Sequence, residues 1–149
     1  MGVKMKISEL KKTNVWELNK HQFELPKQKS KDRPKGRIVT KYYKKADEHK
    51  DWIALNLFLW AQENGKQLWE EYYFDDERRW RSDYALPEMR ILIEYEGLMS
   101  EKSRHTTLKG YTGDTDKYNA AQGGGWVVLR FTVINYKTML TALNKHIKR

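Results

Sequence analysis

Three carboxylates occupy a short segment that reads as two strands joined by a turn. In residues 80–97, polar and apolar side chains alternate on both sides of a turn at residues 87–89, and the proline in that turn does not suit the interior of a central strand. Side chains two apart share one face of a strand. Asp83 therefore lies on one face of the first strand, and Glu94 and Glu96 share a face of the second. We expect the three acids to converge.

The chemistry expected of these acids is the binding of a hard cation. On the opposite face of the second strand, Ile91, Ile93 and Tyr95 read as core positions, so the two glutamates stand on a largely buried segment. An unpaired buried charge is costly, and acids in such a place need a partner. Mg²⁺ is a natural partner, because it is usually held by one or two carboxylates and keeps several waters.

The order of the motifs resembles a known family. The segments RRWRSDYALPEMRILIEYEG (78–97), then His105, then DTDKYNAAQGGGWVVLRFT (114–132) are similar to the PD-(D/E)XK nucleases. The likeness is greatest to relatives of the very-short-patch repair endonucleases and to small phage-type members of that group. It covers residues 48–132, and its strength lies in several separate motifs in the right order, since an isolated acid motif would be weak.

The resemblance implies a fold and an activity. The implied fold is α/β, a restriction-endonuclease-like sandwich in which helices flank a mixed central sheet in the order αβββαβα. The implied activity is a Mg²⁺-dependent DNA endonuclease in which Mn²⁺ can substitute for Mg²⁺. As metal ligands it implies Asp83, Glu94 and Glu96, with Glu48 adding an acid from the first helix. Without the resemblance, Glu48 is equally well explained as a surface acid that suits the helix dipole.

One departure from the family pattern concerns the catalytic lysine. Glu96 stands where the superfamily signature has lysine. Lys117, on the following helix, is then the candidate for a relocated lysine, although it could instead form a surface pair with Asp114 three residues away. His105 is the candidate for the proton-handling histidine of such enzymes, because its pKa lies near working pH; an ordinary loop histidine is the alternative.

Charge and composition are consistent with a nucleic-acid partner. The 149 residues suit one domain, and the net charge is +9. Residues 1–46 hold 14 Lys and Arg against 4 Asp and Glu, which gives +10, and residues 47–149 hold 15 against 16, which gives −1. A basic arm beside an acid-containing domain suits phosphate contacts and metal binding. A solubilising tail would have the same composition.

The chain lacks features of an exported or membrane protein. It contains no cysteine, which agrees with a reducing compartment. No signal-peptide pattern is seen, and the longest apolar run, residues 52–61, is too short to span a bilayer. We expect a cytoplasmic protein of a bacterial or phage-infected host cell, with DNA as its partner. The sequence leaves the oligomeric state open, and a homodimer is one option.

Basic residues near the acids and in the arm are candidates for phosphate contact. In the central hairpin these are Arg79 and Arg81; the arm contributes Lys35, Arg37, Lys41, Lys44 and Lys45. Arginines beside acids more often form local ion pairs. Tyr42 and Tyr43 lie among the arm lysines and could stack on bases, although packing is the commoner role of such aromatics.

The remaining elements must position these residues. We expect a partly flexible arm over residues 1–46 and a nuclease domain over residues 47–149. Within the domain we expect a helix from Asp47 to residues 64–65 that is apolar nearly all round, a strand at 67–74, and a loop at 97–113. A short helix at 114–122, a buried central strand at 126–131 and a final helix at 135–147 follow.

Two other classes of function stay open. A DNA-binding protein that has kept the fold without its chemistry would also lack the motif lysine, and a toxin-like protein acting on RNA would have a similar composition. The preferred DNA structure is not readable, because specificity would lie in the arm and loops.

Overall fold

The computed structural model describes residues 35–97 and 107–147, which contain both helices and strands. The strands are β1 (Arg37–Ile38), β2 (Trp69–Tyr73), β3 (Arg81–Leu86), β4 (Ile91–Glu96) and β5 (Val127–Thr132). The helices are α3 (Glu48–Glu63), α4 (Leu108–Gly123) and α5 (Met139–Ile147), with short 3-10 helices at Pro87–Met89 and Tyr136–Thr138.

The strands form one mixed sheet. Its five strands lie in the order β1-β2-β3-β4-β5. The first three pairings are antiparallel, whereas β4 and β5 run parallel. Parallel neighbours need a crossover connection, and α4 lies within it. The prediction of an α/β fold with a mixed central sheet is confirmed.

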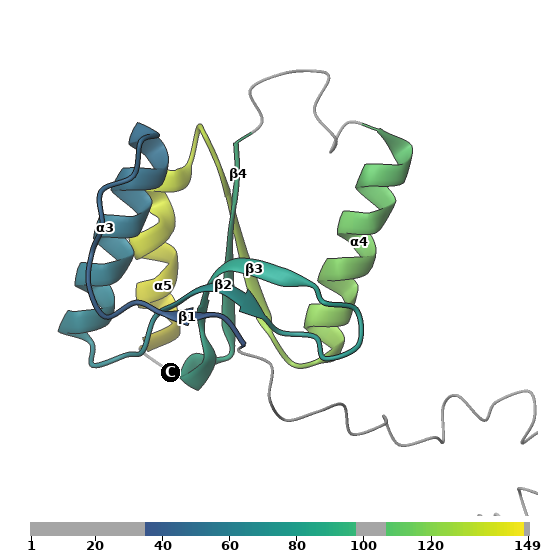
Figure 1. Cartoon of the computed structure of the whole chain (residues 1–149), viewed down its shortest axis with the longest axis horizontal. Helices are drawn as coiled ribbons and strands as arrows, with labels where there is room; N and C mark the ends of the chain where they lie inside the picture. Colours follow the sequence, from purple (N-terminus) through teal and green to yellow (C-terminus); the bar gives the residue numbers. More distant parts are fainter. Residues whose placement is uncertain (1–34, 98–106, 148–149) are drawn as a thin grey trace, which may run out of the picture. The chain divides into compact units, whose positions relative to one another are not determined.

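Helices cover both faces of the sheet. Helices α3 and α5 lie side by side on one face, and α4 lies on the other (Figure 1). On β4, Ile91 and Ile93 belong to the hydrophobic cluster that includes residues of α3 and α5. Leu92 belongs to a second cluster, which includes Ala121 of α4 and Trp126. The predicted alternation along β4 is therefore present, with Glu94 and Glu96 in phase with Leu92 on the α4 side.

Helix α3 begins and ends where the sequence predicts. Asp47 caps it, with Oδ1 accepting a hydrogen bond from Lys50 N at 2.8 Å. Gly65, with φ of 60°, follows its end. Only one side of the helix is buried: Ile53 is 1% exposed and Leu59 is 48% exposed. The helix carries apolar side chains nearly all round, as predicted, but only those on one side are buried, because it packs against the sheet along that side.

The predicted turn of the hairpin is also present. Pro87–Met89 forms a 3-10 helix between β3 and β4, and Arg90 closes it in the left-handed region with φ of 56°. Tyr84 pairs with Ile93 across the two strands. This register places the acids of both strands on the α4 side.

Helix α4 is longer than predicted. It starts at Leu108 rather than near residue 114, and the Thr107 side chain caps it by accepting a hydrogen bond from Gly110 N at 3.1 Å. Gly110 and Gly113 each lower helix propensity by about 1 kcal/mol relative to alanine, and the sequence here therefore resembles a loop. Within the described ranges, no helix has the length and apolar character needed to cross a bilayer.

Strand β5 lies at a sheet edge and not, as predicted, in a buried central position. Among the described strands it pairs only with β4, and Val127 is 39% exposed. The apolar run of this segment is explained by packing on its two faces, which also occurs in an edge strand between helical layers.

Residues 35–46, which the sequence assigned to the arm, contact the sheet. β1 pairs with β2, and Tyr73 N donates a hydrogen bond to Lys35 O at 2.6 Å. Gly36 is required for this close approach: its φ is 143°, and a Cβ there would lie 2.8 Å from Glu70 O. Within this segment only Arg37–Ile38 forms a strand.

Candidate active site

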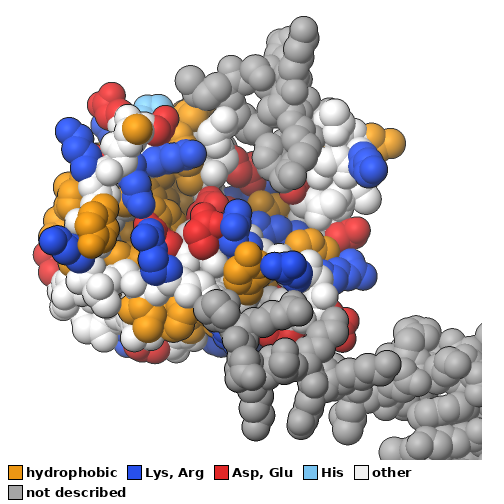
Figure 2. All heavy atoms as spheres, in the orientation of Figure 1, with side chains coloured by type: hydrophobic (Ala, Val, Ile, Leu, Met, Phe, Trp, Pro, Cys, Tyr) orange, Lys and Arg blue, Asp and Glu red, His pale blue; other side chains and the backbone are white. Residues whose placement is uncertain are grey.

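A cleft of about 880 Å³ lies between the ends of β3 and β4 and helix α4. In the space-filling view, acidic and basic side chains lie next to one another around the hollow on the α4 side of the sheet (Figure 2). Asp83, Glu94 and Glu96 all line this cleft. The prediction that the three acids share one face is therefore confirmed, but they do not form a group of three placed to hold one metal ion.

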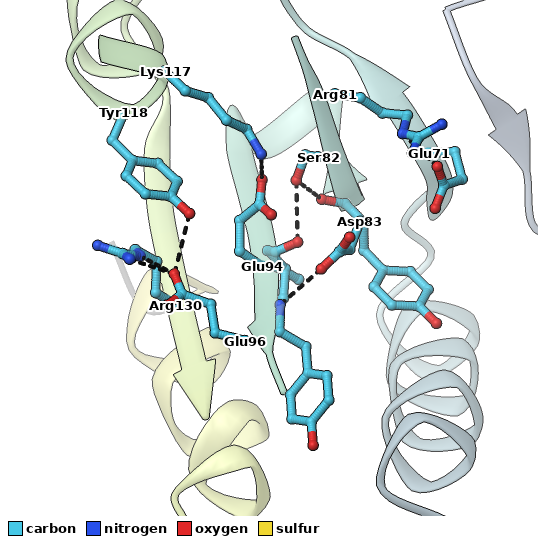
Figure 3. Close-up of polar contacts among 12 residues, drawn as sticks. Glu71, Arg81, Ser82, Asp83, Glu94, Glu96, Lys117, Tyr118 and Arg130 are labelled. Atoms are coloured by element: carbon cyan, nitrogen blue, oxygen red, sulfur yellow. Dashed lines mark hydrogen bonds and ion pairs between the residues drawn. The ribbon is translucent and has the colours of Figure 1, made fainter. Parts of the chain in front are cut away.

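Asp83 and Glu94 lie just beyond the last backbone pair of β3 and β4, where side-chain hydrogen bonds replace the backbone ones. Backbone pairing ends at Tyr84 and Ile93. Beyond that point, Ser82 Oγ donates to Tyr84 O at 2.7 Å and lies 3.1 Å from Ile93 O, and Asp83 Oδ2 accepts from Tyr95 N at 2.9 Å (Figure 3). Because side chains satisfy these backbone groups, the strands part without leaving buried polar groups unpaired.

Glu94 is the buried acid of the cleft. It is 7% exposed, and burial raises its pKa to about 7, with the negative charge of Asp83 acting in the same direction. The positive charge of Lys117 opposes this shift without cancelling it. The carboxyl group therefore changes protonation near neutral pH, and a further cation beside it would favour the ionised form.

Lys117 reaches Glu94 from helix α4. Its Nζ lies 2.6 Å from Glu94 Oε1, and only 16% of its side chain is exposed (Figure 3). Strand β3, strand β4 and helix α4 thus bring together Asp83, Glu94 and Lys117, respectively. Lys117 is the lysine that the sequence analysis named as relocated, and the structure places its ammonium group inside the acidic cleft.

Glu96 is already paired with a cation. Arg130 of β5 donates to Glu96 Oε1 through Nε at 2.7 Å and through a second guanidinium nitrogen, and the Tyr118 hydroxyl lies 3.2 Å from the same oxygen (Figure 3). The Arg130 guanidinium also lies 4.0 Å from the Tyr118 ring centroid. Burial would lower the pKa of Arg130, but the hydrogen bond to Glu96 holds it above its ordinary value.

Sequence reasoning missed three residues of this site: Ser82, Tyr118 and Arg130. Arg130 lies next to Glu94 in the parallel β4–β5 register, and only that register reveals that it reaches Glu96. Tyr118 follows Lys117 on α4. The only signal for Ser82 was a small polar residue next to Asp83 in the strand pattern, which alone does not indicate a role.

The two arginines predicted to contact DNA both line the cleft. Arg81 forms an ion pair with Glu71, and both side chains are about half exposed. Arg79 adopts the left-handed region, with φ of 54°, and makes no ion pair with another described residue. Their contact with DNA stays a prediction.

The five predicted arm cations do not line this cleft. Two of them, Arg37 and Lys45, pair with buried Glu70 of β2, Lys45 at 3.1 Å. Burial would raise the pKa of Glu70, but the hydrogen bonds from both cations bring it below its ordinary value. Lys35 lies 4.0 Å from Asp76. The remaining two are Lys41, which lies over the Tyr43 ring, and Lys44.

Two further predicted residues stand apart from the acids or outside the described chain. Glu48 lies exposed in the first turn of α3 and does not line the cleft. His105 lies outside the described residues. Within residues 35–97 and 107–147, no group of three or more His, Asp or Glu side chains is placed to hold a metal ion. The predicted set of Asp83, Glu94, Glu96 and Glu48 is therefore not assembled among the described residues; Asp83 and Glu94 are the two members whose charges interact within the cleft.

That pair fits a Mg²⁺ site. Mg²⁺ binds oxygen ligands and is commonly held by one or two carboxylates plus waters. Asp83 Oδ1 has no hydrogen bond to another described residue, since Tyr95 N uses Oδ2. Burial raises the pKa of Glu94, and the positive charge of Lys117 is not enough to bring that pKa back to its ordinary value. Both features favour an added cation.

Comparisons with known proteins add no family to this site. No family model matches the sequence, and no curated protein or solved structure matches it either.

Proposed function

We propose that this chain is a Mg²⁺-dependent DNA endonuclease with a restriction-endonuclease-like fold. The observation that carries the proposal is the meeting of Asp83, Glu94 and Lys117 in one cleft, within 2.6 Å for the last two. Two acids and a lysine are the residue types of the D…(D/E)-x-K core that the sequence resembles. The strand order, an antiparallel meander followed by a parallel strand, supports the proposed fold.

The side chains would divide the work of phosphodiester hydrolysis. Asp83 and Glu94 would hold the cation. A bound Mg²⁺ supplies charge neutralisation at the phosphate and lowers the pKa of the attacking water. Lys117, whose ammonium is already in the cleft, would transfer a hydrogen bond to a phosphate oxygen and stabilise charge that develops there. Glu96, held by Arg130 and Tyr118, would orient groups beside the metal site.

Cations in the cleft walls would hold the substrate backbone. Arg79 and Arg81 come from the β2–β3 side, and Lys109 comes from α4. Phosphate contacts of this kind fix the position of a strand without reading its sequence. The proposal therefore assigns binding to the walls and chemistry to the acids below them.

A second candidate is a DNA-binding protein without catalysis. It is favoured by the pairing of Glu96 with Arg130 and by the lack of a three-acid metal group among the described residues. The two candidates share the cleft and differ in whether DNA is cut.

Cleavage assays separate the candidates. The full chain is incubated with supercoiled plasmid and with linear, branched and mismatched duplexes in Mg²⁺, Mn²⁺ or EDTA. We expect cutting with either metal, none with EDTA, and a loss of at least about 100-fold in Asp83→Asn and Glu94→Gln with DNA retention unchanged. Glu88→Gln, an exposed acid of the hairpin turn outside the cleft, is the matched control. Cutting by both cleft variants at the parental rate would refute the proposal, and gel shifts without cuts would establish the second candidate.

A further inference from the structure

Trp80 is an aromatic side chain of the cleft wall that takes no part in either core. It lines the cleft with Tyr73, and neither belongs to the two hydrophobic clusters of the described residues. The indole nitrogens of Trp60 and Trp69 donate hydrogen bonds to side chains, whereas that of Trp80 has no such partner within the described chain. A large, partly exposed ring with no packing role indicates a surface for a ligand.

The loop before β3 holds this ring in place. Asp75 Oδ1 accepts hydrogen bonds from Glu77 N at 2.8 Å and Arg78 N at 2.6 Å, which fixes the turn. Arg79 follows in the left-handed region with φ of 54°, an uncommon conformation for a residue other than glycine. The Arg78 guanidinium lies 4.9 Å from the Trp80 ring centroid and so supports the indole.

Two cations that have no acidic partner among the described residues line the same cleft as the ring. Arg79 precedes Trp80, and Lys109 belongs to α4; both line the cleft. Neither makes an ion pair with another described residue. A cleft lined by an aromatic ring and by such cations can hold a nucleic-acid strand by a base and its flanking phosphates.

The size of the cleft favours a single strand over a duplex. Its volume of about 880 Å³ is that of a site for a small ligand. A base inside a continuous duplex is stacked on its neighbours and paired, so it presents no face to a ring within such a cleft. An unpaired nucleotide does present a face, and stacking on an aromatic side chain tolerates any base.

We propose that Trp80 stacks on the base of an unpaired nucleotide, and that the preferred substrate is DNA that is single-stranded or locally unpaired at the cleft. This inference rests on the proposed function, because it takes the cleft to be the place where the DNA strand binds. It adds the substrate class: a bubble, flap or single strand is bound in preference to perfect duplex.

Binding without chemistry tests the inference. The full chain in EDTA is titrated into a labelled single strand, its perfect duplex, and the same duplex with a central unpaired bubble. The variants are Trp80→Leu, which removes the aromatic face, and Trp80→Phe, which keeps one. Tyr111→Ala is the control, because Tyr111 is an aromatic side chain of α4 that is 67% exposed and does not line the cleft.

The expected pattern is specific to stacking. The parent binds the single strand and the bubble more tightly than the duplex, and Trp80→Leu weakens both by about 5-fold to 150-fold. Trp80→Phe retains most of this affinity, and Tyr111→Ala retains all of it. Single-strand binding quenches tryptophan fluorescence in the parent and much less in Trp80→Phe, a readout that does not depend on Trp80→Leu being folded.

Either of two results would overturn the inference: equal affinity of the parent for duplex and single strand, or equal losses in the leucine and phenylalanine variants. These failures are distinguishable from failure of the proposed function. Metal-dependent cutting that needs Asp83 and Glu94, together with equal duplex affinity, would remove only the stacking role. Tryptophan-dependent binding of unpaired DNA without any cutting would remove only the nuclease assignment.

Discussion

Lys117 of α4 and Glu94 of β4 form an ion pair across the cleft, with Nζ and Oε1 2.6 Å apart and the two residues 23 positions apart in sequence. The strand position two residues after Glu94 is occupied by Glu96, where the resembled nuclease motif has lysine. A positive charge therefore enters the acidic cleft from the helix instead of the strand. Because α4 also carries Tyr118 and Lys109 into the cleft wall, the helix is as important to the site as the hairpin.

Replacing Lys117 should impair chemistry more than binding. In Lys117→Met the cleft keeps its shape but loses the cation that would stabilise charge on the phosphate, and we expect a fall in kcat of about 100-fold or more. Lys109→Met is the matched control on the same helix: it should raise KM a few-fold and leave kcat near the parental value. The measurement is steady-state cleavage in Mg²⁺. Equal effects on kcat in both variants would show that Lys117 only contributes general charge.

The raised pKa of Glu94 predicts how stability depends on pH. In the folded chain the carboxyl keeps its proton up to about pH 7, while its ordinary value is 4.5. The folded state thus binds more protons than the unfolded state between these values, so this group's contribution to stability is lost as pH rises through that window. Relative to Glu94→Gln, we expect the parent to lose on the order of 1–3 kcal/mol between pH 4.5 and pH 8.

Urea denaturation of both proteins without divalent cations, at several pH values, measures this difference. Glu88→Gln controls for the loss of an acid in general. Added Mg²⁺ at pH 8 should stabilise the parent and not Glu94→Gln, since binding to the folded state alone raises stability. A parent-minus-variant difference that does not change with pH would contradict the assigned pKa.

Ser82 should be a structural residue of the site. It is 0% exposed, and its hydroxyl satisfies carbonyl oxygens of Tyr84 and Ile93 beyond the end of the backbone ladder. We expect Ser82→Ala to lower the free energy of unfolding by about 1–3 kcal/mol, the range for a buried polar group left unpaired. Thr138→Ala, which removes an exposed hydroxyl bonded to Asn135 O, should cost about 0.5 kcal/mol or less. Similar losses in both variants would argue against the role of Ser82.

The sequence carried enough information for the hairpin and its acids. The turn at Pro87 and the period of two along β4 are local signals, so they correctly predicted that Asp83, Glu94 and Glu96 share a face. The N-terminus of α3 was equally readable, because Asp47 is a favoured N-cap residue. In each of these places, local preference and tertiary structure agree.

What could not be predicted depends on contacts between distant segments. Gly110 and Gly113 lower the helix propensity of the first turns of α4, so the sequence does not predict them as helical. The cap at Thr107 fixes where the helix begins. The edge position of β5 follows from strand order, which its apolar sequence does not specify. The pairing of Arg130 with Glu96 needs the parallel register between two strands that a helix separates. Trp80 had no assigned role in the sequence, because only the structure shows that it belongs to neither hydrophobic cluster.

Glu96 and Arg130 should act as one unit that is separable from metal binding. Because Arg130 already holds the Glu96 carboxylate, we expect Glu96→Gln and Arg130→Met each to reduce kcat by about 10-fold and the double variant to be no worse than either alone, as for residues in direct contact. The Mg²⁺ concentration for half-maximal cleavage should stay near the parental value in all three. In Asp83→Asn, by contrast, that concentration should rise steeply or cleavage should vanish. A rise in the Mg²⁺ midpoint of Glu96→Gln as large as that of Asp83→Asn would instead identify Glu96 as a third metal ligand, released from Arg130 when the ion binds.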